Sequence, residues 1–376
     1  MSIKRREFLK LAMLTTGSVA ASSVITTKAF SYQPAQIGLE ECLTLSPLEM
    51  AKRSYLVQDS WQEIKKMVKL IKDPGIRVRV ENILANPAPT FMEKYQDKAA
   101  KAELRKKLIA QNLLNEEIDE NTFLPPLSSY QKAPQPFYSA PGSGYMSHHA
   151  YPGGLATHVL ANTKLSLAIY HNYAEVYGYN LNKDVILAAQ LLHDLHKPWV
   201  FQWQEDYSSR SELKIAGTGE HHIYSIAESM YRNMPPEVVV AQACAHQRPW
   251  SDPEETKVVG WIKAAAIMAG KDPIKAGYLS NSGKTIPVPR LQENFVTHLG
   301  DHDWVLTVPA AKWIIPVTQQ IAQEEYGFSQ ADLTSKKFNA FRNYVFSQVS
   351  IMKLYQIFCT KGKTGVKKEI KQLILS

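Results

Sequence analysis

The sequence predicts an all-α fold, and three observations favour it. Apolar residues recur at helical spacing in segment after segment, and Ser-Pro or Asp-Pro pairs, glycines and charged residues separate those segments. No strand-like alternation or internal repeat stands out. Hydrophobic residues make up 45% and charged residues 21% of the 376 residues, close to globular averages. We therefore expect one main helical core with helical additions at both ends.

The first 29 residues are expected to be a targeting segment rather than part of the folded domain. Residues 4–10 read Lys-Arg-Arg-Glu-Phe-Leu-Lys, a weakly apolar stretch covers 11–25, and Thr27-Lys28-Ala29 follows. This order resembles a twin-arginine (Tat) export signal, although Lys4 stands where Ser or Thr is commoner. The resemblance implies the Tat export machinery as a partner, cleavage after Ala29 and a periplasmic location. The alternative is an ordinary amphipathic first helix.

The apolar stretch of the signal does not predict a membrane anchor. It is about 15 residues long and contains Thr, Ser and Gly, which is too short and too polar to span the roughly 30 Å hydrocarbon core of a bilayer. We expect no membrane span in the mature form.

Residues 30–145 are expected to form a helical amino-terminal arm. Helices fit residues 47–71, 76–84 and 90–114, with Ser46-Pro47 and Asp73-Pro74 as boundaries. Residues 124–144 are rich in Pro, Ser, Tyr and Gly, which predicts a loop before the next domain.

Residues 146–280 form the expected central domain, with helices at 155–177, 183–193, 221–233, 236–246 and 255–269. Seven of the 11 histidines lie between His158 and His246. Residues 281–376 are expected to be a helical carboxy-terminal extension, with helices near 310–326 and 338–358.

The charge gives little reason to expect nucleic-acid binding. The formal net charge is +8, but residues 1–29 contain five basic residues and one acidic residue, so half of the excess lies in the expected signal. The remaining +4 gives a weak electrostatic case for a polyanion partner. No stable DNA binding is expected.

The chemistry is expected at the adjacent pair His193-Asp194, which ends an apolar helix. Imidazole and carboxylate are side chains that a divalent ion can share with water. One such pair is weak support, but His158, His221-His222, His246 and Asp272 accompany it at helical positions of the same domain.

This arrangement over residues 148–280 resembles the HD-domain superfamily of metal-dependent phosphohydrolases, whose pattern is a His, a His-Asp pair with a nearby Lys, further histidines and a final Asp. The resemblance implies an HD-domain helical bundle and one or two divalent ions per chain (Mn, Fe, Co, Ni, Mg or Zn). It implies that the first ion is bound by His158, His193, Asp194 and Asp272. Asp194 would bridge to a second ion bound by His222 and His246, with His221 as the alternative to His222; a single-ion site is also open.

The same resemblance gives roles to neighbouring residues. Asp194 and Lys197 are the expected catalytic residues, with the Lys197 ammonium on a phosphate oxygen, and a spare histidine such as His149, His196 or His221 would protonate the leaving group. His196 stands where Gly is usual and is interpreted as altering the turn or touching substrate.

Two nearby segments have competing interpretations. The run 298–304, His-Leu-Gly-Asp-His-Asp-Trp, suits a metal or substrate loop, but ordinary turn chemistry is favoured. The aromatic residues at 199, 201, 203 and 207 suit base stacking, but packing is favoured.

The leading functional hypothesis is a periplasmic phosphohydrolase that cleaves a small phosphomonoester or phosphodiester, for example a nucleotide. The alternatives are a di-iron oxygenase on the same scaffold and a catalytically inactive HD module that binds a ligand and signals. Fold resemblance alone does not decide among them.

Overall fold

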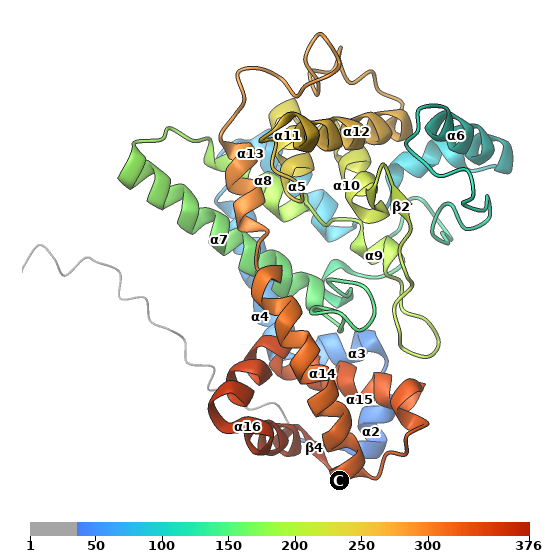
Figure 1. Cartoon of the computed structure of the whole chain (residues 1–376), viewed down its shortest axis with the longest axis vertical. Coiled ribbons are helices and arrows are strands. Elements are labelled where there is room, and N and C mark those ends of the chain that lie inside the picture. Colours follow the sequence, from blue (N-terminus) through green and yellow to red (C-terminus); the bar gives the residue numbers. More distant parts are fainter. Residues whose placement is uncertain (1–35) are drawn as a thin grey trace, which may run out of the picture. The chain divides into compact units, whose positions relative to one another are not determined.

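The computed structural model describes residues 36–376 (Figure 1). The expected export signal lies outside the described residues. Among the described residues no helix has both the length and the apolar character needed to cross a membrane.

The amino-terminal segment is helical, as expected. Its elements are strand β1 (Ile37–Gly38), helices α2 (Leu39–Thr44), α3 (Pro47–Arg53), α4 (Tyr55–Lys69) and α5 (Pro74–Ala85), the 3-10 helix η1 (Thr90–Tyr95), α6 (Lys98–Ala110) and η2 (Phe137–Ser139). Ser46 forms a capping box with Glu49, and Asp73 caps α5 ahead of a first-turn proline. These caps mark the helix starts that the sequence indicates.

The central segment contains the helices that surround the histidines. They are α7 (Gly154–Tyr177), α8 (Lys183–Leu192), α9 (Lys197–Val200), α10 (Glu220–Tyr231), α11 (Pro236–Cys244), α12 (Asp252–Ala269) and α13 (Glu293–Gly300). The short strands β2 (Lys214–Ile215) and β3 (Thr218–Gly219) form an antiparallel hairpin before α10. The expected all-α fold of the central domain is confirmed.

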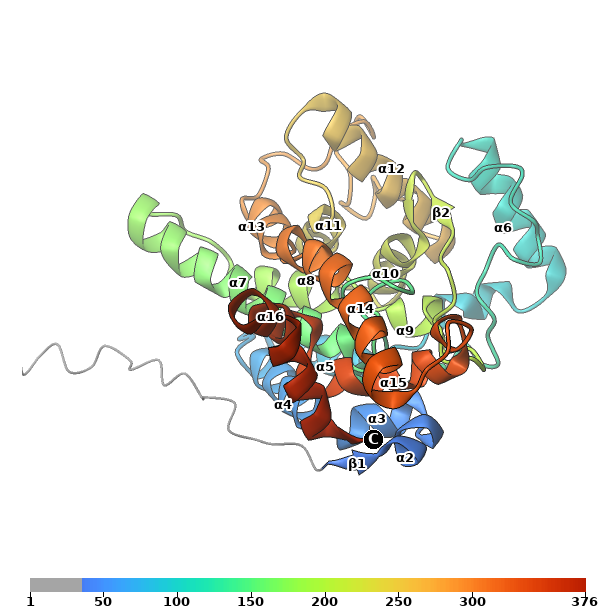
Figure 2. The same cartoon turned by 60° about the horizontal axis from the view of Figure 1, so that its bottom comes forward.

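The carboxy-terminal segment consists of α14 (Trp304–Tyr326), η3 (Asp332–Thr334), α15 (Lys336–Val349), α16 (Ile351–Leu373) and strand β4 (Ile374–Leu375). Strand β4 pairs in parallel with β1, so the first and last described elements meet. Helix α15 packs against α2, α3 and α4. Figure 2 shows the orange-red α15 next to the blue α3.

Two large hydrophobic clusters support these segments. The first joins the helices from α4 to α12, including Ile64, Val80 and Leu187, and therefore underlies the histidines. The second joins β1–α3 with α14–α16, including Met50, Ile314 and Phe341. The start of the expected helical arm, up to α3, thus shares a core with the carboxy-terminal extension, whereas α4 to α6 pack with the central helices. The helix pattern of the sequence does not predict this division.

Several helix predictions need correction. The expected helix over 47–71 is two helices, α3 and α4, divided at Ser54, and the expected helix over 90–114 is the 3-10 helix η1 followed by α6. The expected helix over 338–358 is broken at Ser350, whose φ of 63° is outside the helical region, and its hydroxyl caps the next helix. Helix α13 was not expected at all, although it carries part of the candidate site.

Candidate metal centre

Four polar side chains meet in a group that we call the first cluster: His158, His193, Asp194 and Asp301. They come from the ends of three helices that are far apart in the sequence. His158 lies in the second turn of α7, and His193 and Asp194 follow directly after α8. Asp301 is the residue after α13, which packs against α7, α8 and α11. All four side chains are buried.

Gly300 allows α13 to approach α7 closely enough for this meeting. A Cβ at that position would lie 1.9 Å from Ser166 Oγ on α7, where no side-chain atom fits. The absence of a side chain at the last residue of α13 therefore places Asp301 beside His158.

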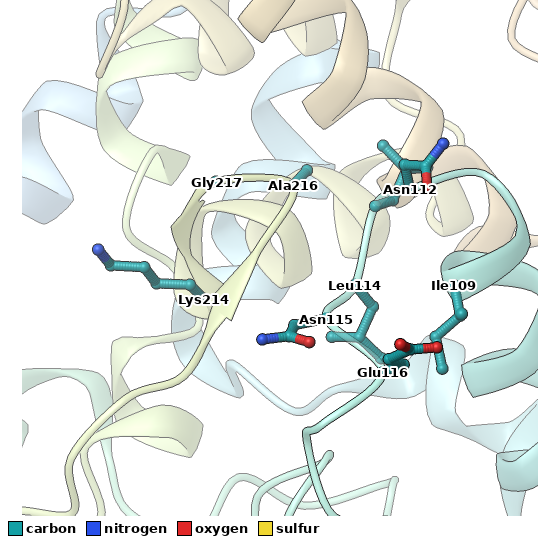
Figure 3. Close-up of a pocket in the computed structure, with 9 residues that line it drawn as sticks. Ile109, Asn112, Leu114, Asn115, Glu116, Lys214, Ala216 and Gly217 are labelled. Atoms are coloured by element: carbon teal, nitrogen blue, oxygen red, sulfur yellow. The ribbon is translucent and has the colours of Figure 1, made fainter.

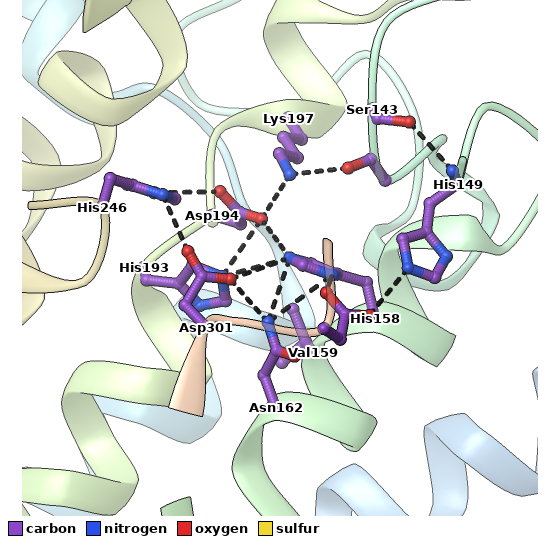
Figure 4. A network of polar contacts seen from close by, with 12 residues as sticks. Ser143, His149, His158, Val159, Asn162, His193, Asp194, Lys197, His246 and Asp301 are labelled. Atoms are coloured by element: carbon purple, nitrogen blue, oxygen red, sulfur yellow. Dashed lines mark hydrogen bonds and ion pairs between the residues drawn. The ribbon is translucent and has the colours of Figure 1, made fainter. Parts of the chain in front are cut away.

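The donor atoms of this first cluster have the spacing of ligands on one ion (Figure 4). His158 Nε2 and His193 Nε2 are 3.3 Å apart and lie 3.1 and 3.2 Å from Asp194 Oδ2. Both nitrogens lie 3.4 Å from Asp301 Oδ1. Two atoms that bind one ion from about 2.1 Å, at angles of about 90–110°, are about 3.0–3.4 Å apart.

A second cluster shares the carboxylate of Asp194. His221 Nε2 lies 3.3 Å and His246 Nε2 3.5 Å from Asp194 Oδ1, the oxygen that does not face the first cluster. Ligand atoms of Asp194, His221, His222 and His246 all lie within 4.8 Å of one another. The two oxygens of Asp194 therefore face two separate sets of histidines.

Unsatisfied buried atoms show that these clusters fit cations. Asp194 is completely buried, and neither of its carboxylate oxygens accepts a well-aligned hydrogen bond. His246 Nε2 also has no hydrogen-bond partner. Leaving such atoms unpaired is costly in a protein interior. An ion between the donors would satisfy all of them.

The charge balance supports the same conclusion. Four carboxylates, those of Asp194, Asp301, Asp303 and Glu212, gather here with the single ammonium of Lys197, which contacts Asp194 and donates to Gly142 O at 2.6 Å. With neutral histidines the formal sum is −4 + 1 = −3. Divalent cations would balance this negative charge.

The pKa shifts describe how the ion-free chain balances these carboxylates. Burial alone would lower the pKa of His193, but Asp194 and Asp301 outweigh it and raise that pKa to about 9. Burial likewise opposes ionisation of Asp194, yet His193 and Lys197 hold its pKa well below the usual range. Protons on histidines thus stand in for cations, and cation binding would release them.

Contacts behind the clusters orient the imidazole rings. In several histidines Nδ1 faces an oxygen while Nε2 faces the cluster, the arrangement that fixes a ligand ring and its tautomer. These pairs are His193 with Gln190 O at 2.7 Å, His246 with Asp301 Oδ2 at 2.8 Å, His158 with Asp303 Oδ1 at 3.3 Å and His221 with Glu212 Oε2 at 2.5 Å.

Asp303 also connects the site to the loop before α7. Its Oδ2 lies 3.0 Å from Nε2 of His149, whose ring is buried. His149 is therefore held behind His158 and is not one of the side chains that line the cavity described below. The expectation that His149 protonates the leaving group is not supported by this placement.

Asp272 does not belong to the centre, and the prediction that it binds the first ion is wrong in the structure. Its side chain is 47% exposed, and Oδ1 accepts hydrogen bonds from the backbone amides of Ile274 and Lys275. Gly270 ends α12 in a left-handed conformation, so the chain turns away before Asp272. Asp301 stands in its place.

His196 also departs from expectation, because it points into the core. Its ring is buried between Phe91 and Trp199, with centroids 6.0 and 5.7 Å away. Its Nε2 lies 3.8 Å from the buried Glu228. A contact with substrate or a proton for the leaving group is therefore not expected from His196.

The choice between His221 and His222 remains a prediction, since the structure brings both into the cluster. His221 Nε2 approaches Asp194 Oδ1 to 3.3 Å, whereas His222 stacks on His246 with ring centroids 3.4 Å apart and has Nδ1 bonded to Thr218 Oγ1 at 2.6 Å.

Sequence reasoning missed Asp301, Asp303 and Glu212. The signal for the first two is present in the run 298–304, for which the sequence favours ordinary turn chemistry. Glu212 lies outside any helix and had no pattern to mark it. Only the fold shows that these residues meet the histidines.

A cavity of roughly 310 Å³ opens onto the two clusters. Its wall includes Lys197, His148, Phe201, Glu212 and Trp304, together with His158, His221, His222, His246 and Asp301. Burial, with His149 next to it, lowers the pKa of His148 to about 2, so that ring is neutral near pH 7.

A larger hollow of about 610 Å³ lies elsewhere, between the end of α6 and hairpin β2–β3 (Figure 3). Asn112, Glu116 and Lys214 are among its lining residues, and it contains none of the clustered histidines. Size alone therefore does not identify the site.

The HD domain family model matches residues 155–268, which include the clustered histidines and Asp194 but not Asp301. Over 101 residues, 26% of this chain, the sequence is 35% identical to the dihydroneopterin 2′,3′-cyclic phosphate phosphodiesterase of Methanocaldococcus jannaschii. The chain spans about 39% of that relative's length. No solved structure matches.

Proposed function

We propose that the chain is a metal-dependent phosphohydrolase that cleaves a small phosphodiester or phosphomonoester. The observation that carries the proposal is the single carboxylate of Asp194 shared by two sets of histidines, several of which line a cavity together with Lys197. The similar protein named as a phosphodiesterase supports a phosphate ester as substrate.

The residues that would hold the ions are those of the two clusters: His158, His193, Asp194 and Asp301 for one ion, and Asp194, His246 and His221 or His222 for the other. Divalent cations bound there would lower the pKa of water and add positive charge near phosphate oxygens.

The chain's own groups supply orientation and further charge. The ammonium of Lys197 is held by Gly142 O and by Asp194, so it is fixed at the cavity wall as a point charge for a phosphate oxygen. His221 shares the proton on Nδ1 with Glu212, which keeps its Nε2 directed at the cluster.

The reaction is a displacement at phosphorus. A water oxygen bonds to phosphorus as the ester P–O bond breaks, the water loses a proton, and the departing alcohol oxygen gains one. No nucleophilic side chain is required, and among the residues that line the cavity the serines are engaged elsewhere: Ser143 Oγ accepts from the His149 amide and Ser147 Oγ bonds His148.

The test uses the full chain loaded with Mn²⁺, Fe²⁺, Co²⁺ or Ni²⁺ and a panel of phosphodiesters and phosphomonoesters, including 2′,3′-cyclic nucleotides. Asp194→Asn should lower kcat/KM at least about 100-fold, since it removes the shared ligand. Asp272→Asn is the matched control and should retain wild-type activity. No cleavage of any ester by the wild type, or oxygen consumption by an iron-loaded form, would contradict the proposal.

We also propose that residues 1–29 direct export to the periplasm by the twin-arginine route. The support is the order of the basic, apolar and small-residue regions in that segment.

A further inference from the structure

The residues that line the cavity include one phenyl ring and one indole, those of Phe201 and Trp304. Phe201 is buried and packs on the His221 ring, with centroids 5.4 Å apart. Trp304 lines the same cavity but remains 50% exposed. An indole is a large apolar surface that gains free energy when covered, so this exposure leaves room for a ligand to stabilise it.

The position of Trp304 is fixed relative to the clusters. It is the first residue of α14 and follows Asp303 directly, only three residues after Asp301. Its ring is 5.7 Å from that of His302. Val305 and Leu306 are also exposed but do not line the cavity, so the contact with this space is particular to Trp304.

The polar part of the wall offers fewer new contacts. The hydroxyls of Ser143 and Ser147 are already bonded within the chain, as is one oxygen of Glu212. Beyond the phosphate, a ligand therefore gains most from the faces of the aromatic rings.

We propose that the cavity takes a small phosphate ester that carries a planar ring, with the phosphate at Lys197 and the ring stacked on Trp304. This inference rests on the proposed function and adds the chemical class of the substrate to it. A volume of roughly 310 Å³ is at the lower end for small-molecule pockets, which favours one nucleotide-sized molecule over a polymer. Stacking on an aromatic side chain is sequence-tolerant, so it selects a ring rather than a particular base.

The test compares AMP with ribose 5-phosphate, two probes that differ only by the base. Dissociation constants are measured in the cold with the Mn²⁺-loaded full chain, and the ligands are checked for integrity afterwards. The wild type should bind AMP roughly 10-fold or more tightly than ribose 5-phosphate.

Three variants locate the effect. Trp304→Ala should weaken AMP binding to the level of ribose 5-phosphate and leave ribose 5-phosphate binding as it is, and Trp304→Phe should restore most of the difference. Trp313→Ala is the matched control, because Trp313 is 57% exposed on the same helix but does not line the cavity. Metal content and Tm of each variant report folding.

Each other outcome is decisive. Equal binding of both probes by the wild type, no effect of Trp304→Ala, or an equal loss for both probes would overturn the stacking proposal while leaving phosphate recognition intact. If the metal-loaded wild type binds neither probe and hydrolyses no ester, the proposed function fails together with the inference.

Discussion

Gly300→Ala should damage the centre through packing alone, without touching a candidate ligand. An alanine in place of a helical glycine usually stabilises by up to about 1 kcal/mol. Here the new Cβ would lie 1.9 Å from Ser166 Oγ and 3.0 Å from Gln190 Oε1, both buried on α7 and α8. Relief of such a clash costs about 1–3 kcal/mol, so destabilisation should win and α13 should shift together with Asp301.

The assay is Tm by scanning fluorimetry together with ion affinity by chelator competition. Gly300→Ala should lower Tm by several degrees and weaken ion binding about 10-fold or more. Adding Ser166→Ala removes the Oγ but leaves the Ser166 Cβ position 3.1 Å away. The double variant should therefore lose less stability than the two single variants lose in sum. Gly260→Ala in α12, where the nearest atom is 3.9 Å away, is the control and should be neutral or stabilising. Undiminished Tm and ion affinity in Gly300→Ala would refute the reasoning.

Three further predictions concern the contact behind His158, the protonation of His193 and the expected export signal. Asp303→Asn should weaken ion binding about 10- to 100-fold with little change in Tm, because the Asp303 carboxylate orients the imidazole ring of His158. Unchanged affinity in a chelator titration would contradict this. For EDTA-treated protein, the pKa of His193 is raised to about 9 from about 6.5 in the unfolded chain, so its contribution to stability is complete below about pH 6.5 and is lost as pH rises through about 9; Tm should fall between those values, and a flat profile counts against the proton-for-cation balance. Replacing Arg5 and Arg6 by Lys should keep the chain in the cytoplasmic fraction, and unaffected periplasmic recovery would refute the Tat assignment.

Much of the fold followed from local patterns because each of those patterns has a local cause. The helical spacing, Ser46 as a cap and the proline after Asp73 predict helix starts from interactions within a few residues. Helix α13 escaped because its eight residues are too few for a periodic pattern to stand out.

The candidate site was predictable where the ligands lie on long helices of one domain. The structure brings His158 close to the pair His193-Asp194, where the helix pattern and the family resemblance agree. The last carboxylate of the first cluster, that of Asp301, was not predicted. Spacing along the chain does not reveal that the segment after Gly270 is a long loop, nor that α13 returns to α7. The orientation of His196 depends on the turn after α8 and on its neighbours Phe91 and Trp199, which are long-range facts.

The ion content of the purified full chain tests the central claim most directly. Wild-type protein should contain one or two divalent ions per chain by elemental analysis, Asp301→Asn should lose at least one of them, and Asp272→Asn should match the wild type. Full ion content in Asp301→Asn, with a loss in Asp272→Asn, would contradict the account.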